Sequence, residues 1–417
     1  MTATRKPIPR DSRSFAAAFR AGFPPAGLLA GNGYTRRSMS NRARSTTTLA
    51  LLVLGAAPLL PGCTRYFSSA PDLAEPSGAV VPRNPASPRS LAMFEGSTGR
   101  ALGWADLMSA ASWADCTFIG ERHDDPVAHA VQLAVFEDLA AGYPGTALAL
   151  EHLERDEQDL VDRYLRGEIA AATFIDGTES RDWAGADTWV PFFQPMIDAA
   201  REAGSPVVAA NAPREAVREA RAIGHDAMRA KPADERALFD LPVTRRGGAF
   251  TGDWNERWDA YFDRFVEIMS PADDADPAAT RERLANVFLS QSVWDGTMGA
   301  SAASARDRGA PKVVLCAGCF HIERDGGTVL QYEARRSDDR VLTITVIDAS
   351  SRALRDEDRG AADIVVYGYP LARPKRDPAP SPTVSPAPEH APGDPAPPEP
   401  PAAGAAPASG SPPPPTR

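Results

Sequence analysis

The sequence is poor in the residues that most often build zinc and redox sites. It has four cysteines and six histidines in 417 residues. The only CxxC pair, Cys316 and Cys319, lies in "CAGC", and a zinc ribbon needs two such pairs, so this kind of site is excluded. Because the pair ends an apolar run, a packed Cys316 with an incidental Cys319 is expected, and a disulfide or ligand role is the alternative.

The chain also lacks the excess of positive charge that nucleic acids select. Its formal net charge is −10. The first 62 residues hold nine Lys and Arg against one acid, so the remainder is more acidic than the whole chain. Since phosphate backbones are bound by clustered Lys and Arg, a nucleic-acid partner is excluded.

A membrane-spanning run is missing from the N-terminal segment. The apolar stretch at residues 49–60 is too short to cross a bilayer as a mature helix. Two arginines precede it and "LLPGC" closes it, a pattern typical of a bacterial lipoprotein signal that starts at Met39 and is cleaved before Cys63, whose sulfur then carries the lipid. We therefore predict a leader over residues 1–62. With Thr64 rather than Asp after the cysteine, an outer-membrane lipoprotein is expected.

Neither end of the remaining chain has a sustained pattern of apolar residues typical of a helix or a strand. Residues 63–93 are rich in Pro, Ser and Ala, which predicts a flexible tether. Seventeen of the 45 residues in 373–417 are proline, so this tail is expected to be disordered. The foldable part is then one domain, residues 94–372, without internal repeats.

The central domain alternates short apolar runs with amphipathic stretches. This alternation predicts an α/β fold with a mainly parallel sheet flanked by helices. One helix is expected from Pro126, with Asp125 as N-cap and Gly142 past its end. An aromatic-rich helix is expected at 254–265 in a long insertion, and with the aromatic segment 182–195 it forms either core or a cover for a flat ligand. Strands are expected at 116–121, 146–152, 206–211, 312–318, 341–348 and 363–368.

Polar side chains follow four of these strands, at the edge where open α/β sheets bind ligands. They are Glu121 and His123, Glu151, Asn211 and His321. A carboxylate at Glu151 is costly to bury unless a cation, an imidazole or a metal accompanies it. The set of Glu121, His123, Glu151 and His321 is compatible with a divalent metal, a general acid/base pair or a haem iron, and the three alternatives stay open at this point.

Two more histidines lie close to this set in the sequence. His152 follows Glu151 directly, and because successive strand residues face opposite sides, His152 is expected outside the site. His129 lies one turn inside the helix that begins at Pro126. It is expected to be a packed or solvated helix residue rather than a ligand.

Five motifs occur in order: "GERHDDPVAHAVQLAVFEDL", "ALALEHLERDEQDLVDRYLRGE", "VVAANAPREAVREARAIG", "SQSVWDGTMGASAA" and "VVLCAGCFH". Together, over about residues 94–370, they resemble the ChaN family of haem-binding lipoproteins, in a superfamily with TIKI/TraB proteins and erythromycin esterases. The resemblance implies a surface-tethered protein that binds haem or a related iron compound, in haem or iron uptake. It implies these cofactor-binding residues: His123, His129, Glu151, Asn211, Tyr261, Gln291, Asp295 and His321.

One departure from the family pattern concerns the iron ligand. The tyrosine often found before a proline is absent here, where Phe193, Gln194 and Pro195 stand. If the family holds iron by a tyrosinate, Tyr261 or Tyr164 has to substitute.

Two other functions remain as alternatives. One is a metal-dependent or His/Glu-based hydrolase, similar to the TIKI peptidases or erythromycin esterases, with Glu121, His123, Glu151 and His321 as its catalytic and metal-binding residues. In it, His123 is the general base. The other is an envelope scaffold whose Pro-rich tail binds partners. A homodimer that sandwiches the ligand suits the haem hypothesis, because a single crevice leaves one face of a flat ligand exposed.

Overall fold

A computed structural model of the protein describes residues 87–244, 251–270 and 276–370. The predicted leader, the lipidation site Cys63 and the tail 373–417 lie outside the described residues. Among the helices of the described ranges, none combines the length and the apolar character needed to cross a membrane.

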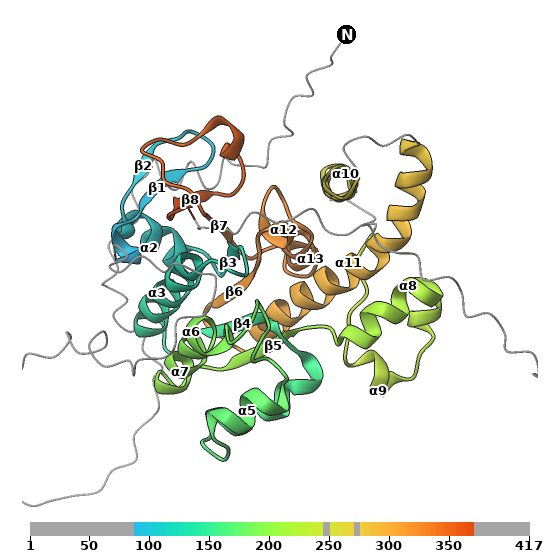
Figure 1. Cartoon of the computed structure of the whole chain (residues 1–417), viewed down its shortest axis with the longest axis horizontal. Helices are drawn as coiled ribbons and strands as arrows, with labels where there is room; N and C mark the ends of the chain where they lie inside the picture. Colours follow the sequence, from blue (N-terminus) through green and yellow to red (C-terminus); the bar gives the residue numbers. More distant parts are fainter. Residues whose placement is uncertain (1–86, 245–250, 271–275, 371–417) are drawn as a thin grey trace, which may run out of the picture. The chain divides into compact units, whose positions relative to one another are not determined.

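The strands of the domain are β1 Ala92–Glu95, β2 Ala101–Leu102, β3 Cys116–Glu121, β4 Ala147–Glu154, β5 Val207–Asn211, β6 Val313–Gly318, β7 Val341–Ile347 and β8 Ile364–Tyr367. They form one sheet in the order β2-β1-β8-β7-β3-β6-β4-β5 (Figure 1). Every pair from β8 to β5 is parallel, whereas β1 is antiparallel to β2 and β8. The predicted α/β fold and all six predicted strands are confirmed. The short edge strands β1 and β2 are not predicted by the sequence pattern, and β1 begins two residues before the predicted start of the domain.

The helices are α2 Trp104–Trp113, α3 Pro126–Gly142, α4 Gln158–Leu165, α5 Ala171–Gly177, α6 Trp189–Phe192, α7 Gln194–Glu202, α8 Arg214–Arg229, α9 Ala233–Arg236, α10 Thr251–Met269, α11 Pro277–Asp307, α12 Cys319–Ile322 and α13 Gly327–Arg335, with single turns η1 Pro88–Ser90, η2 Arg155–Glu157 and η3 Asp356–Asp358. They cover both faces of the sheet (Figure 1). One face packs against α2, α3 and α7, and the other packs against α11 and α13.

Alternation along the strands sends successive side chains into two different cores. Ile119 of β3 and Leu150 of β4 lie in the core under α3. Phe118 and Ala149, one residue earlier in each strand, lie in the core under α11 and α13. Burying a large apolar side chain contributes roughly 1.5–3 kcal/mol to stability. The side of the sheet that each strand residue faces is therefore strongly fixed up to the strand ends.

The predicted aromatic-rich helix is present as α10, and its aromatic face is core. Trp254, Trp258, Tyr261 and Phe265 are all buried. They pack with Phe288 of α11 and residues of α13. The core alternative is therefore confirmed for this helix, and it does not cover a ligand with these rings.

Helix α3 begins as predicted. Asp125 accepts the backbone N–H of Val127 through Oδ1 at 2.8 Å, and Pro126 occupies the first turn. Gly142 is the last helical residue rather than the residue beyond the end. The cap fixes where the chain leaves β3 and hence the turn that carries His123.

We expect the cap to contribute measurably to stability. Asp125→Ala removes the acceptor of the Val127 N–H and should lower the free energy of unfolding by about 1 kcal/mol. Asp125→Ser restores a capping oxygen and should recover most of the loss. Urea denaturation followed by circular dichroism measures both, and equal losses in the two variants would contradict the capping role.

Candidate functional site

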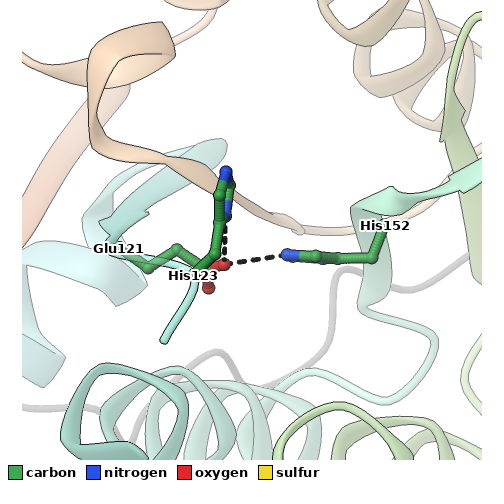
Figure 2. Close-up of side chains that lie close together, drawn as sticks. All are labelled: Glu121, His123 and His152. Carbon is green, nitrogen blue, oxygen red and sulfur yellow. Dashed lines mark hydrogen bonds and ion pairs between the residues drawn. The ribbon is translucent and has the colours of Figure 1, made fainter. Parts of the chain in front are cut away.

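A buried carboxylate, Glu121, gathers three imidazoles at the carboxyl end of β3. It is 1% exposed. Its Oε1 lies 2.8 Å from Nε2 of His152 and 3.1 Å from Nδ1 of His123 (Figure 2). Its Oε2 accepts a hydrogen bond from Nε2 of Gln132 at 2.6 Å and lies 3.1 Å from Nδ1 of His129. One carboxylate of β3 therefore holds four side chains, one from β4, two from α3 and one from the turn after β3.

The strand register explains how His152 reaches Glu121. Strand β6 lies between β3 and β4; Glu121 pairs with Gly318, and Cys316 pairs with Leu150. Two residues beyond Leu150, His152 reaches the level of Gly318 on the same face as Glu121. The imidazole of His152 and the carboxylate of Glu121 therefore meet across the end of β6.

The prediction that His152 lies outside the site is wrong. Alternation along β4 does hold, since Glu151 and His152 contact different partners on opposite faces. The error concerns Glu121. It follows Ile119 by two residues and so faces α3, together with His152 rather than with Glu151.

The surroundings of Glu121 shift the pKa values of its histidines in different directions. Burial opposes ionisation of Glu121, but His129, His152 and the hydrogen bond with His123 hold the pKa of Glu121 well below its ordinary value. Burial also disfavours the charged form of His129, yet Glu121 raises the pKa of His129 above 6.5. For His152 burial prevails and lowers its pKa, and its Nδ1 has no hydrogen-bond partner among the described residues. These contacts favour the charged form of His129 and the neutral form of His152.

His129 supports the cluster from inside. It is 3% exposed, and its Nε2 lies 3.1 Å from the carbonyl oxygen of His123. Its Nδ1 faces Gln132 and Glu121. The interpretation of His129 as a packed helix residue is confirmed, and neither ring nitrogen is left to bind a ligand.

His123 is the accessible member of the cluster. Its side chain is 43% exposed. With Nδ1 on Glu121, the second ring nitrogen points away from the carboxylate (Figure 2). Burial lowers the pKa of His123, but the hydrogen bond with Glu121 and the charge of Glu151 outweigh it, so the net pKa is raised.

Aromatic rings of the 182–195 segment cover this cluster. Trp183 lies with its ring centroid 4.7 Å from that of His123 and 4.3 Å from that of His152. Phe193 lies 4.1 Å from His152 and 4.6 Å from His129. Trp189, Phe192 and Phe193 of this segment belong to the core under α3, and Trp183 packs against this core beside His123.

The remaining predicted residues form a second buried group on the other face. Nε2 of His321 lies 3.4 Å from Oε1 of Glu151, and its Nδ1 lies 2.7 Å from Oδ1 of Asp295. Burial opposes the charged form, yet Glu151 and Asp295 raise the pKa of His321 to about 10. Burial also opposes ionisation of Glu151, but His321 and His123 lower its pKa to about 2. The predicted set is therefore split, with Glu121 and His123 in one group and Glu151 and His321 in the other.

The two groups meet at Gly318. The Gly318 N–H donates to Oε2 of Glu151 at 2.6 Å. A β-carbon on Gly318 would lie 2.8 Å from Cε1 and 3.1 Å from Nε2 of His123, and 3.6 Å from Oε2 of Glu151. The sequence pattern did not indicate that the missing side chain of Gly318 makes room for His123.

Three other predicted residues hold the backbone or the second group. Asn211 donates to the carbonyl oxygen of Glu151 at 3.0 Å. Tyr261 donates to Oδ2 of Asp295 at 2.7 Å, and Gln291 donates to the Tyr261 hydroxyl at 3.0 Å. Burial and the charge of Asp295 raise the pKa of Tyr261 well above 10, which disfavours a tyrosinate.

Neither the other tyrosine nor the CxxC pair adds a ligand. Tyr164 donates its hydroxyl to Asp198 at 2.5 Å, on the far side of α4. Cys316 and Cys319 are free thiols, so the disulfide alternative is wrong and the packed alternative is confirmed for the buried Cys316.

A metal ion has one clear set of ligand atoms in the described residues. Glu121, His123 and His152 each offer one atom, and these atoms lie within 4.8 Å of one another. Two nitrogens and one carboxylate oxygen are typical ligands of zinc and iron. This set differs from the predicted one, because His152 takes the place of Glu151 and His321.

A separate cavity of about 610 Å³ lies beside the edge strand β5. Arg155, Gln158, Asp240 and Ser301 are among its lining residues, and it includes none of the predicted ligands. The site therefore lies at the strand ends rather than in this cavity.

A sequence-family profile described as "Haem-binding uptake, Tiki superfamily, ChaN" matches residues 107–331. The chain belongs to this family. The matched range contains both groups of site residues. No curated protein matches the chain.

Solved structures with a related fold include three with functional descriptions. ChaN of Campylobacter jejuni, described with cofacial haem binding, is 17% identical, with a TM-score of 0.49, 66% of this chain and 96% of that chain covered. The type III effector HopBA1 is 14% identical, with a TM-score of 0.36 and coverages of 63% and 92%. An erythromycin esterase mutant, EreC in its open conformation, is 12% identical, with a TM-score of 0.32 and coverages of 64% and 79%.

The second group predicts a specific dependence of stability on pH. Since the pKa of His321 is about 10 in the folded protein and near 6.5 when unfolded, its contribution is complete below pH 6.5 and is lost as pH rises to about 10. The free energy of unfolding should therefore fall over this window more steeply in the wild type than in His321→Gln. Urea denaturation at several pH values measures both slopes, and parallel curves would show that His321 is not a buried cation.

Proposed function

We propose that this chain binds haem and that Nε2 of His123 holds the iron. The observation that carries the proposal is the geometry of His123, whose Nδ1 is fixed on Glu121 while the half-exposed ring directs its other nitrogen away. A carboxylate behind a ligating imidazole fixes its tautomer and makes the free nitrogen a better donor. Membership of a family described as haem-binding supports haem as the ligand.

The contacts of Glu121 favour haem over a bare divalent ion. Oε2 of Glu121 already meets His129 and Gln132, which leaves this carboxylate fewer oxygens for a free cation. Haem, when bound, would supply an iron that the neutral imidazole of His123 would hold. Trp183, beside His123, adds an aromatic surface next to that nitrogen.

The other residues of the cluster hold His123 in place. Gln132 and His129 occupy Oε2 of Glu121, which leaves Oε1 to His123 and His152. Each contact restricts the carboxylate that orients the His123 ring. His129 and His152 therefore contribute to ligand binding through Glu121.

We also propose the cellular setting that the sequence predicts. Lipid on Cys63 would anchor the chain in the outer membrane, the residues after Cys63 would tether the domain, which includes β1, and the Pro-rich tail 373–417 would follow it. Haem or iron uptake is the role that suits such an anchored protein. The support is the "LLPGC" motif and the composition of the two ends.

A hydrolase is the second candidate, because the same contact suits a general base. An imidazole oriented by a carboxylate through Nδ1 can take a proton from water at Nε2. Turnover of an ester or peptide panel, abolished by His123→Ala, would favour this function over haem binding.

Haem titration followed by absorbance tests the proposal. The wild type should show a Soret shift that saturates at stoichiometric haem. His123→Ala should lose the shift or bind at least about tenfold more weakly, a change of about 1.4 kcal/mol. His225→Ala is the matched control, because His225 lies on α8 and bonds to the carbonyl oxygen of Leu289. No Soret shift in the wild type, or equal binding in His123→Ala, would reject the proposal.

Fractionation of cells tests the lipid anchor. Cys63→Ser removes the sulfur that would carry the lipid, so the protein should become soluble or stay attached through an uncleaved leader. Immunoblots of membrane and soluble fractions, with mass spectrometry of the N-terminus, distinguish these forms. Recovery of normally processed, membrane-bound Cys63→Ser protein would contradict lipidation.

A further inference from the structure

His321 presents no free nitrogen to a ligand. Its Nδ1 lies 2.7 Å from a carboxylate oxygen of Asp295, and its Nε2 lies 3.4 Å from one of Glu151. The residue is 7% exposed. An imidazole with an acceptor at each nitrogen carries two protons, and a protonated nitrogen cannot bind a metal.

The surroundings of His321 hold it in this position. Asp295 is fully buried and also accepts hydrogen bonds from Tyr261 at 2.7 Å and from Thr328 at 2.9 Å. The Gln291 amide nitrogen lies 3.2 Å from Nδ1 of His321, and its acceptors are the Tyr261 hydroxyl at 3.0 Å and Asp295 at 3.4 Å. Three helices, α10, α11 and α13, thus supply the groups that fix Asp295.

The effect of His321 reaches the backbone through Glu151. One oxygen of Glu151 faces His321, and the other accepts the Gly318 N–H at 2.6 Å. Gly318 is the last residue of β6, directly before the short helix α12. The position of Gly318 is therefore set by the Glu151 carboxylate. His321 holds Glu151, and Asp295 holds His321.

The side-chain position of Gly318 faces the edge of the His123 ring. The place of a β-carbon on Gly318 is only 2.8 Å from Cε1 and 3.1 Å from Nε2 of His123. A small movement of this backbone would thus displace the ring edge that carries Nε2.

We infer that His321 is a positioning residue and not an iron ligand: with Asp295 it holds Glu151 against the Gly318 amide, and so sets the backbone against which His123 presents Nε2. This inference rests on the proposed haem function. It separates the two histidines of "GERH" and "GCFH", which look equivalent in the sequence. His123 binds the iron, and His321 acts on His123 through Glu151 and Gly318.

The first experiment compares the two histidines by haem titration of the full chain, with absorbance and electron paramagnetic resonance spectra at saturation. His123→Gly should lose the axial-ligand spectrum, and free imidazole should restore it. His321→Ala should bind roughly 10–100-fold more weakly, as expected for a residue behind a ligand. Its spectrum at saturation should equal that of the wild type and should not respond to imidazole.

Two results would overturn the inference. If the saturated spectrum of His321→Ala is altered and free imidazole restores it, His321 is a ligand. If His321→Ala binds haem as tightly as the wild type, His321 has no positioning role.

A second pair of variants keeps the inference testable if His321→Ala does not fold. Glu151→Gln retains an oxygen that accepts the Gly318 N–H, whereas Glu151→Ala removes it. Haem affinity should therefore fall less in Glu151→Gln than in Glu151→Ala. Equal losses in the two variants would overturn the link through Gly318.

A measurement without haem separates failure of this inference from failure of the proposed function. Nitrogen-15 spectra of histidine side chains in the haem-free protein report the position of the His123 ring. The His123 signals should move in His321→Ala and Glu151→Ala, and unchanged signals would overturn the inference. If the wild type does not bind haem at all, the proposed function fails, while the His123 signals still decide the positioning role.

Discussion

The site depends on one interaction, the burial of an ionised Glu121 at the end of β3. A carboxylate removed from water is unstable unless charge and hydrogen bonds replace its hydration. Here His129 supplies the opposite charge, and Gln132, His123 and His152 supply the remaining contacts. The geometry of the imidazoles follows from this requirement. Each ring is turned so that one nitrogen meets Glu121, and only His123 is exposed enough to offer the other.

A second constraint comes from Gly318. It pairs with Glu121 on β3, bonds to Glu151 through its amide and lies against the ring of His123. A β-carbon there would lie 2.8 Å from Cε1 of His123, so the His123 ring would have to shift. The groups on the two faces of the sheet are therefore connected through one residue without a side chain.

Local patterns in the sequence were enough to predict much of the fold. Six strands, the Asp125 cap of α3 and a polar edge at the carboxyl ends of the strands all depend on residues close in the chain. The pairing of Glu121 with His152 depends instead on the register of β3, β6 and β4, which is a contact between distant segments. The sequence did contain a usable signal. Ile119 and Leu150 lie two positions before Glu121 and His152, so all four residues face the same side of the sheet.

Other features were beyond the reach of the sequence pattern for similar reasons. The strands β1 and β2 are short and have little periodicity, so only the pairing of β1 with β8 and of β2 with β1 identifies them. Whether an aromatic stripe covers a ligand or fills a core depends on its neighbours. Trp183 covers the His123 cluster, whereas Trp254 and Trp258 pack in the core.

The most direct test of the central claim is a crystal structure of the haem complex. In that complex we expect the iron to be bonded to Nε2 of His123, with Nδ1 of the same ring still on Glu121. An iron bonded to His321, Tyr261 or another atom, or a His123 ring turned away from Glu121, would contradict it.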